Sequence, residues 1–192
     1  MKDRIQHLVQ SSIEVKSKVL ADVQIIAQVD QIVHLLVSCF KSGKRVWFCG
    51  NGGSAADAQH LAAEFSGRFY KNRKALPAEA LHCNTSYLTA VANDYSFNQI
   101  YARLVDGICE PGDVLLAYST SGNSSNIIEA LEVARDKDIH TIGFTGSTGG
   151  KMSEYCDILV KVPSSDTPRI QEVHMLLGHI ICELTENLLF PE

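Results

Sequence analysis

His60 and Glu64 form the first pair of residues whose types and spacing could do chemistry. They are four positions apart, so on a helix their side chains share one face. An imidazole and a carboxylate can serve as acid and base, or can bind a metal ion together. The glycine-rich segment Gly50–Gly53 lies shortly before the pair in the chain. This arrangement predicts a reactive centre beside a ligand-binding loop.

The segment Val46–Phe65 contains the elements that must position this pair. Val46–Cys49 is a short, apolar, β-prone run, which predicts a buried strand. Gly50–Gly53 follows and can adopt backbone angles that bulkier residues cannot. Ser54 is a good helix N-cap, and the alanine-rich segment Ala55–Phe65 predicts a helix. A strand that runs through a glycine loop into a helix N-terminus can bind an anion or a polyol.

A second loop with the chemistry of an anion site follows the apolar run Val114–Tyr118. Its four hydroxyl residues are Ser119, Thr120, Ser121 and Ser124. They precede a predicted helix, Asn126–Asp136, whose dipole favours negative charge at its N-terminus. A cap needs only one side-chain oxygen, so the extra hydroxyls favour a phosphate pocket over a serine-rich cap. The loop lacks the lysine of a P-loop, so a sugar phosphate fits it better than a nucleoside triphosphate.

Two further groups of polar residues could complete such a site. Gln171 and His179 are eight positions apart on a predicted helix, an offset of roughly 80° around it and about 12 Å along it. They could reach one small site only if their side chains lean toward each other, and His174 is a competing candidate. The other group is Asn93 and Asp94, which could cap a turn or hold sugar hydroxyls.

The remaining pattern alternates apolar runs with helical stretches. The further runs that predict strands are Ala78–Cys83, Val114–Tyr118, Thr141–Thr145 and Ile158–Val162. The predicted helices lie within residues 1–41 and at Phe97–Cys109, Ser124–Asp136, Lys151–Tyr155 and Ile170–Leu189. With Val46–Cys49 the strands number five, so we expect an α/β fold with a five-stranded parallel sheet flanked by helices on both faces.

This pattern predicts one domain over residues 1–192, because no segment has the length or composition of a linker. Within it we expect N-terminal helices over 1–43, an α/β core over 44–166 and a C-terminal helix over 167–190. Gly43 is placed where a helix C-cap glycine should be.

Composition narrows the class of protein. The net charge is −5 and no basic stripe is present, so nucleic acid is an unlikely partner. The six cysteines form no CxxC pair and mostly lie in apolar runs, which predicts buried, reduced thiols. The N-terminus lacks the apolar region of a signal peptide, and no apolar run approaches transmembrane length. We therefore expect a cytoplasmic protein with no membrane partner.

The chain resembles the sugar isomerase (SIS) domain proteins, and among them the phosphoheptose isomerases, over nearly its full length. The motifs that support the resemblance are Gly50–Ser54, Ser119–Ser124 and Arg169–His174. The resemblance implies a flavodoxin-like sheet and the interconversion of sedoheptulose 7-phosphate and D-glycero-D-manno-heptose 7-phosphate. This reaction is the first step toward the ADP-heptose of bacterial lipopolysaccharide. It also implies a homotetramer with active sites at subunit interfaces.

The resemblance assigns roles to particular residues. The implied substrate-binding residues are Asn51, Gly52, Gly53, Glu64, Asn93, Asp94, Ser119, Thr120, Ser121, Ser124 and Gln171. The implied zinc ligands are His60, Glu64, Gln171 and His179, with no organic cofactor. Glu64 and His179 are the implied catalytic residues, which favours His179 over His174. Arg68 matches a family arginine near the site.

Chemistry leaves one point open in this assignment. Glu64 cannot easily be a firmly bound ligand and a free base at once. Either zinc binding is loose and substrate displaces the carboxylate, or the metal is mainly structural. Gln171 is also an unusual zinc ligand, because zinc prefers His, Cys and carboxylate groups.

Two other functions compete with the isomerase. One is a non-catalytic SIS tetramer that binds the DNA replication initiator, and the other is a sugar-phosphate sensor. The chain ending Leu188–Pro191 is similar to that of the initiator-binding relative. That relative lacks the acid at position 64 and the histidine at position 179, whereas this chain has both. Glu64 and His179 therefore favour the enzyme.

Overall fold

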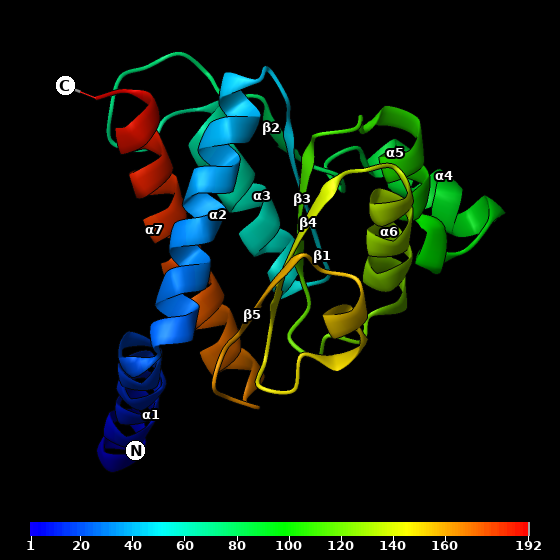
Figure 1. Ribbon diagram of the computed structural model, residues 1–192. Coiled ribbons are helices and arrows are strands. Elements are labelled where there is room, and N and C mark those ends of the chain that lie inside the picture. Colours follow the sequence, from blue (N-terminus) through cyan, green and yellow to red (C-terminus); the bar gives the residue numbers. More distant parts are fainter. Residues whose placement is uncertain (192) are drawn as a thin grey trace.

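A five-stranded parallel sheet forms the centre of the computed structural model, which describes residues 1–191 (Figure 1). The strands are β1 (Val46–Gly50), β2 (Ala78–Ala80), β3 (Val114–Tyr118), β4 (His140–Thr145) and β5 (Ile158–Lys161). Their order is β2-β1-β3-β4-β5, and every neighbouring pair is parallel. The predicted fold class is confirmed. Strand order reverses between β1 and β3, which is where open α/β sheets bind ligands.

Helices cover both faces of the sheet, as expected for parallel strands that are buried on both sides (Figure 1). One face is covered by α2 (Val23–Lys41), α3 (Gly53–Ser66) and α7 (Thr167–Leu189). The other is covered by α4 (Thr85–Asp94), α5 (Ala102–Ile108) and α6 (Ser125–Asp136). Two short 3₁₀ helices, η1 (Phe97–Gln99) and η2 (Gly150–Glu154), complete this second side. Each side has its own cluster of buried apolar residues.

The N-terminal segment is two helices, because the chain turns at Asp22 between α1 (Lys2–Ala21) and α2. The Asp22 carboxylate accepts hydrogen bonds from the N–H groups of Gln24 and Ile25, which caps α2. Gly43 follows α2 with a φ of 71°, the left-handed conformation that favours glycine. Helix α1 projects away from the sheet and contacts α7 and α2 (Figure 1).

Several predicted boundaries are wrong. Ser54 is not the N-cap of α3: the helix begins at Gly53, Gly52 is its N-cap, and Ser54 is buried in the first turn. The second strand ends at Ala80, three residues earlier than predicted. The predicted helix Phe97–Cys109 is divided into η1 and α5, and η2 is a 3₁₀ helix where Lys151–Tyr155 was expected.

Helix α4 was not predicted at all. Asn84 starts it, since its side-chain oxygen accepts a hydrogen bond from the N–H of Tyr87 at 3.0 Å. Asn93 and Asp94 are therefore the last two residues of a helix and not a turn cap.

Helix α2 is longer and more apolar than we expected from the sequence. Among residues 1–191 it is the one helix long and apolar enough to cross a membrane, with a mean hydropathy of 1.5. The expectation that no apolar run approaches transmembrane length is wrong for this helix. About 44% of that segment is buried inside the fold, where α2 packs against α7 and β5. This is the pattern of a core helix.

Candidate active site

His60, Glu64 and His179 lie together between α3 and α7. The Nε2 atoms of His60 and His179 are 3.0 Å apart, and His60 Nε2 is 3.3 Å from Glu64 Oε1. The two imidazole rings meet edge to face, with their centroids 5.2 Å apart. The His60 side chain is 49% exposed and the Glu64 side chain 22% exposed. The cluster is thus partly open to a ligand.

Close packing of α3 and α7 brings these side chains together. A Cβ atom added to Gly178 would lie 2.5 Å from Leu61 Cδ1, so a larger residue there would force the Leu61 side chain to move. His179 follows Gly178 and faces His60, which precedes Leu61. The close approach of Gly178 to Leu61 therefore lies next to the contact between the two histidines.

The three side chains could hold a metal ion. Their candidate ligand atoms all lie within 4.8 Å of one another. Two imidazole nitrogens and a carboxylate oxygen are donors that zinc prefers, and such donors are about 3.4 Å apart when bound tetrahedrally. The observed separations of 3.0 and 3.3 Å are close to this value. The donor set therefore fits a divalent metal.

His174, the competing candidate, lies elsewhere. Its ring is completely buried between Tyr118 and Phe144, and its Nε2 atom is 3.2 Å from the carbonyl oxygen of Thr145. Burial lowers the pKa of His174 to about 4, although the contact with the Thr145 carbonyl opposes the shift. A neutral, enclosed imidazole of this kind belongs to the core.

The glycine loop lies beside Gln171 at the start of α7. A Cβ atom added to Gly53 would lie 2.6 Å from Gln171 Nε2, so the amide of Gln171 packs directly on the loop backbone at Gly53. Gly52 has a φ of 56°, and it is exposed like Gly53. The Asn51 and Asn126 amides exchange two hydrogen bonds of 2.8 Å, which join this loop to the first turn of α6. The two predicted ligand loops are therefore directly connected.

In the hydroxyl-rich loop after β3, the side chain of the N-cap residue does not cap helix α6. Ser124 is the N-cap of α6, but its side chain accepts no hydrogen bond from the helix. Its Oγ atom instead lies 2.9 Å from Ser119 Oγ, which is also 3.4 Å from Ser121 Oγ. Thr120 and Ser121 line a hollow of about 310 Å³. The helix N-terminus remains available to an anion.

The structure does not bring Asn93 and Asp94 to this cluster. They lie exposed at the end of α4, bonded to each other at 2.8 Å, and α4 is on the opposite face of the sheet from α3 and α7 (Figure 1). Arg68 is exposed in the segment that follows α3.

Two polar residues near the loops were missed by sequence reasoning. Asn126 is buried and joins the loops through Asn51. Asp57 lines a hollow of about 530 Å³ together with Gln171, and burial raises the pKa of its carboxyl group. A helical spacing of three positions from Asp57 to His60 was a signal that could have found it.

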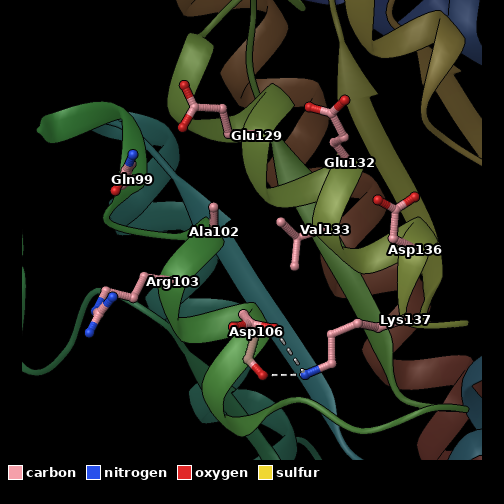
Figure 2. Close-up of a pocket in the computed structure, with 9 residues that line it drawn as sticks. All are labelled: Gln99, Ala102, Arg103, Asp106, Glu129, Glu132, Val133, Asp136 and Lys137. Carbon is pink, nitrogen blue, oxygen red and sulfur yellow. Dashed lines mark hydrogen bonds and ion pairs between the residues drawn. The ribbon is translucent and has the colours of Figure 1, made fainter. Parts of the chain in front are cut away.

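A separate hollow of about 520 Å³ lies between α5 and α6 (Figure 2). Its charged lining residues are Arg103, Asp106, Glu129, Glu132, Asp136 and Lys137. Lys137 is paired with Asp106 at the lower end in Figure 2. None of the predicted site residues lines this hollow, so it is not the candidate active site.

The fold and the two ligand loops define a protein of the SIS domain family, whose pattern matches residues 11–146. The chain belongs to the phosphoheptose isomerases within it, which are aldose–ketose isomerases. It is 52% identical over 192 residues to the phosphoheptose isomerase of Clostridium acetobutylicum, covering 100% of this chain and 98% of the relative. It is 48% identical over 190 residues to that of Aneurinibacillus thermoaerophilus, covering 99% and 96% of the two chains.

Solved structures agree with this assignment. The phosphoheptose isomerase of Neisseria gonorrhoeae superposes with a TM-score of 0.91 at 39% identity, covering 97% of this chain and 98% of that one. That of Francisella tularensis gives a TM-score of 0.92 at 36% identity, with coverage of 96% and 97%. The resemblance inferred from the sequence motifs is confirmed, and the isomerase is favoured over the initiator-binding tetramer and the sensor.

Proposed function

We propose that the His60–Glu64–His179 cluster is the catalytic centre of a sedoheptulose 7-phosphate isomerase. The observation that supports this most directly is the 3.0 Å approach of the two Nε2 atoms beside the Glu64 carboxylate. His60 and Glu64 lie on the helix that follows the glycine loop, so a substrate bound at the loops could extend its reacting carbons toward Glu64. The product would be D-glycero-D-manno-heptose 7-phosphate.

The substrate phosphate binds at the loop Ser119–Ser124 in this proposal. Clustered hydroxyl groups and a helix N-terminus without a side-chain cap are suited to a dianion. Asn51, Gly52, Gly53 and Gln171 contact the sugar chain. The hydrogen bond from Asn51 to Asn126 joins the glycine loop to the helix that follows the phosphate loop, so both loops lie at the same ligand-binding edge of the sheet.

Glu64 is the carbon base of the proposed reaction. Its carboxylate takes the proton from C1 of the ketose, and an enediolate forms as the C2 carbonyl oxygen gains negative charge. The same carboxylic acid returns the proton to C2, which gives the aldose. His179 gives a proton to the oxygen on C2 and takes one from the hydroxyl on C1, so the charges balance across the step.

His60, Glu64 and His179 would hold zinc, and Gln171 would be a fourth donor. The bond to Glu64 would be loose, so that the substrate displaces the carboxylate and frees it to act as the base. Zinc bound there would polarise the substrate carbonyl. The chemistry of the donors supports this, since histidine and carboxylate groups are typical zinc ligands. No organic cofactor is needed for a proton transfer between adjacent carbons.

The active enzyme is a cytoplasmic homotetramer with shared active sites in this proposal, and residues 1–192 form one domain. Helix α1 exposes the apolar side chains of Ile5, Leu8, Val9 and Ile13 along one stretch. A single subunit leaves this surface without a partner, as expected of a helix that packs between subunits. Asn93 and Asp94 would reach substrate at such an interface, because within one chain they are exposed and on the other face of the sheet.

Hydrogen exchange between solvent and substrate tests the catalytic assignment. The wild-type chain should isomerise sedoheptulose 7-phosphate and incorporate deuterium from D₂O at C1 or C2. His179→Ala should bind substrate and remain folded but lose turnover, because the proton on oxygen can no longer be moved. A wild-type chain that binds the sugar phosphate without exchange or isomerisation would contradict the proposal and favour the sensor.

A further inference from the structure

A buried ion pair joins the segment after α3 to the end of α7. Arg73 Nε lies 2.8 Å from Glu186 Oε1, and the two side chains are only 3% and 1% exposed. The Glu186 carboxylate also accepts backbone hydrogen bonds from Phe69, Tyr70 and Lys71 at 3.1, 2.8 and 2.9 Å. Its hydrogen-bonding capacity is therefore used entirely to hold one loop against α7.

Arg73 uses the rest of its guanidinium to cap α3. Nη2 donates to the carbonyl oxygen of Glu64 at 2.8 Å, and Nη1 donates to that of Phe65 at 2.7 Å. These are among the last carbonyls of α3, which have no partner inside the helix. A cation at this end also complements the helix dipole. Nη1 donates as well to the carbonyls of Gly67 and Lys74, at 3.1 Å each.

We propose that Arg73 and Glu186 are positioning residues for the catalytic cluster, because their ion pair fixes the backbone of Glu64 relative to the helix that contains His179. The inference rests on the proposed function. Arg73 holds the carbonyl oxygen of Glu64, whose side chain is in the cluster. Glu186 lies seven positions after His179 on α7, about two turns along the same rigid helix.

A purely stabilising role explains this pair less well. Burial of two charges costs solvation free energy, so a buried ion pair is often no more stabilising than apolar residues of the same size. Its hydrogen bonds are instead directional, and they fix the last turn of α3 in one place. Groups that hold metal ligands in position typically change metal affinity or activity by about 10–100-fold when they are replaced.

Zinc affinity and kinetics of folded variants test the proposal. Arg73→Lys keeps the charge but loses the planar fork that reaches Glu186, Glu64 and Phe65 together. We expect its affinity for zinc, measured by titration calorimetry on metal-free protein, to fall by about 10–100-fold. We also expect kcat to fall by a similar factor with little change in KM, because the phosphate loop is on a different element.

Two further variants distinguish a loss of positioning from a loss of folding. Glu186→Gln keeps the shape of the side chain and an acceptor oxygen for the loop, but it removes the charge that pairs with Arg73. It should fold, yet it should show a similar loss of zinc affinity. Lys71→Ala is the control, since it removes only the bond from Lys71 Nζ to the carbonyl of Phe190 in the same loop. Its zinc affinity and kcat should match those of the wild type.

The outcomes separate this inference from the proposed function. Folded Arg73→Lys with wild-type zinc affinity and kcat would overturn the positioning role, as would an equal loss in Lys71→Ala. If wild-type protein binds no zinc and Glu64→Gln retains full turnover, the proposed function itself fails. A loss of zinc affinity in both Arg73→Lys and Glu186→Gln, with the control unchanged, supports the inference.

Discussion

The Nε2 atoms of His60 and His179 lie 3.0 Å apart, although 119 positions separate the two residues in the chain. His60 is on α3 and His179 is on α7, so the contact exists only when these two helices pack together. The glycine at position 178 permits that packing. A change to the interface between α3 and α7 should therefore alter the proposed catalytic cluster, even where none of its three residues is replaced.

Replacement of Glu64 by Gln should lower turnover by about 10²-fold or more, since a positioned general base contributes roughly that much. Substrate binding should largely survive, because the proposed phosphate site is in another loop. Deuterium incorporation at C1 or C2 should fall together with turnover. Normal exchange in this variant would remove Glu64 from the carbon-base role.

Replacement of His60 by Ala should weaken zinc binding by more than about 10²-fold. This is a larger effect than we expect for Arg73, which only holds a ligand in position. Calorimetric titration of metal-free protein measures this directly. His34→Ala is a matched control, because His34 is an exposed histidine that pairs with Asp30 in α2 and lies outside the cluster. Equal zinc affinity of the two variants would argue against the metal site.

Replacement of Ser121 or Ser124 by Ala should weaken binding of the sugar phosphate by about 1–2 kcal/mol each, the scale of a hydrogen bond to a charged group. Unphosphorylated heptose should bind more weakly than the phosphate to the wild type and respond little to these changes. Ser153→Ala in η2 serves as the control, since this exposed serine is outside the loop. Equal affinity of the wild type for both sugars would refute the phosphate assignment.

The free energy of unfolding should decrease as the pH falls from about 6.5 to about 4 because of His174. Its pKa in the folded protein is lowered to about 4 by burial, whereas the unfolded chain has the ordinary value of 6.5. The unfolded state therefore takes up a proton in this range and the folded state does not, which costs about 3 kcal/mol by pH 4. The stabilising contribution is fully present above pH 6.5.

Denaturant titrations of wild type and His174→Phe across this pH range check the prediction. The phenyl ring suits the surrounding Tyr118 and Phe144 rings but cannot be protonated. The variant should lose less stability than the wild type between pH 6.5 and 4. Parallel pH profiles of the two proteins would show that His174 is not the group responsible.

Sedimentation at micromolar concentration should report a tetramer. The physical reason is the exposed apolar stretch of α1, which a single subunit leaves in water. Ile5→Lys combined with Ile13→Lys should dissociate the tetramer without unfolding the sheet, because both side chains are half-exposed in the single chain. A stable wild-type monomer with full activity would contradict the shared active sites.

The amino-acid sequence by itself determined the features that depend on neighbours within a few residues. The apolar run before Gly50 and the hydroxyl-rich loop after Tyr118 predicted two strand–loop–helix units, and the structure contains both. Alternation of strands and helices predicted the parallel sheet. These features are local because strand propensity, glycine backbone freedom and helix-terminus chemistry each act over one or two turns of chain.

The tertiary structure decided which distant residues meet. His174 and His179 lie roughly 140° apart around one helix, and only the direction in which α7 faces the sheet makes the first a core residue and the second a neighbour of His60. The same packing pairs Arg73 with Glu186, which the sequence separates by 113 positions. Such contacts depend on how whole helices pack, and no local pattern encodes that choice.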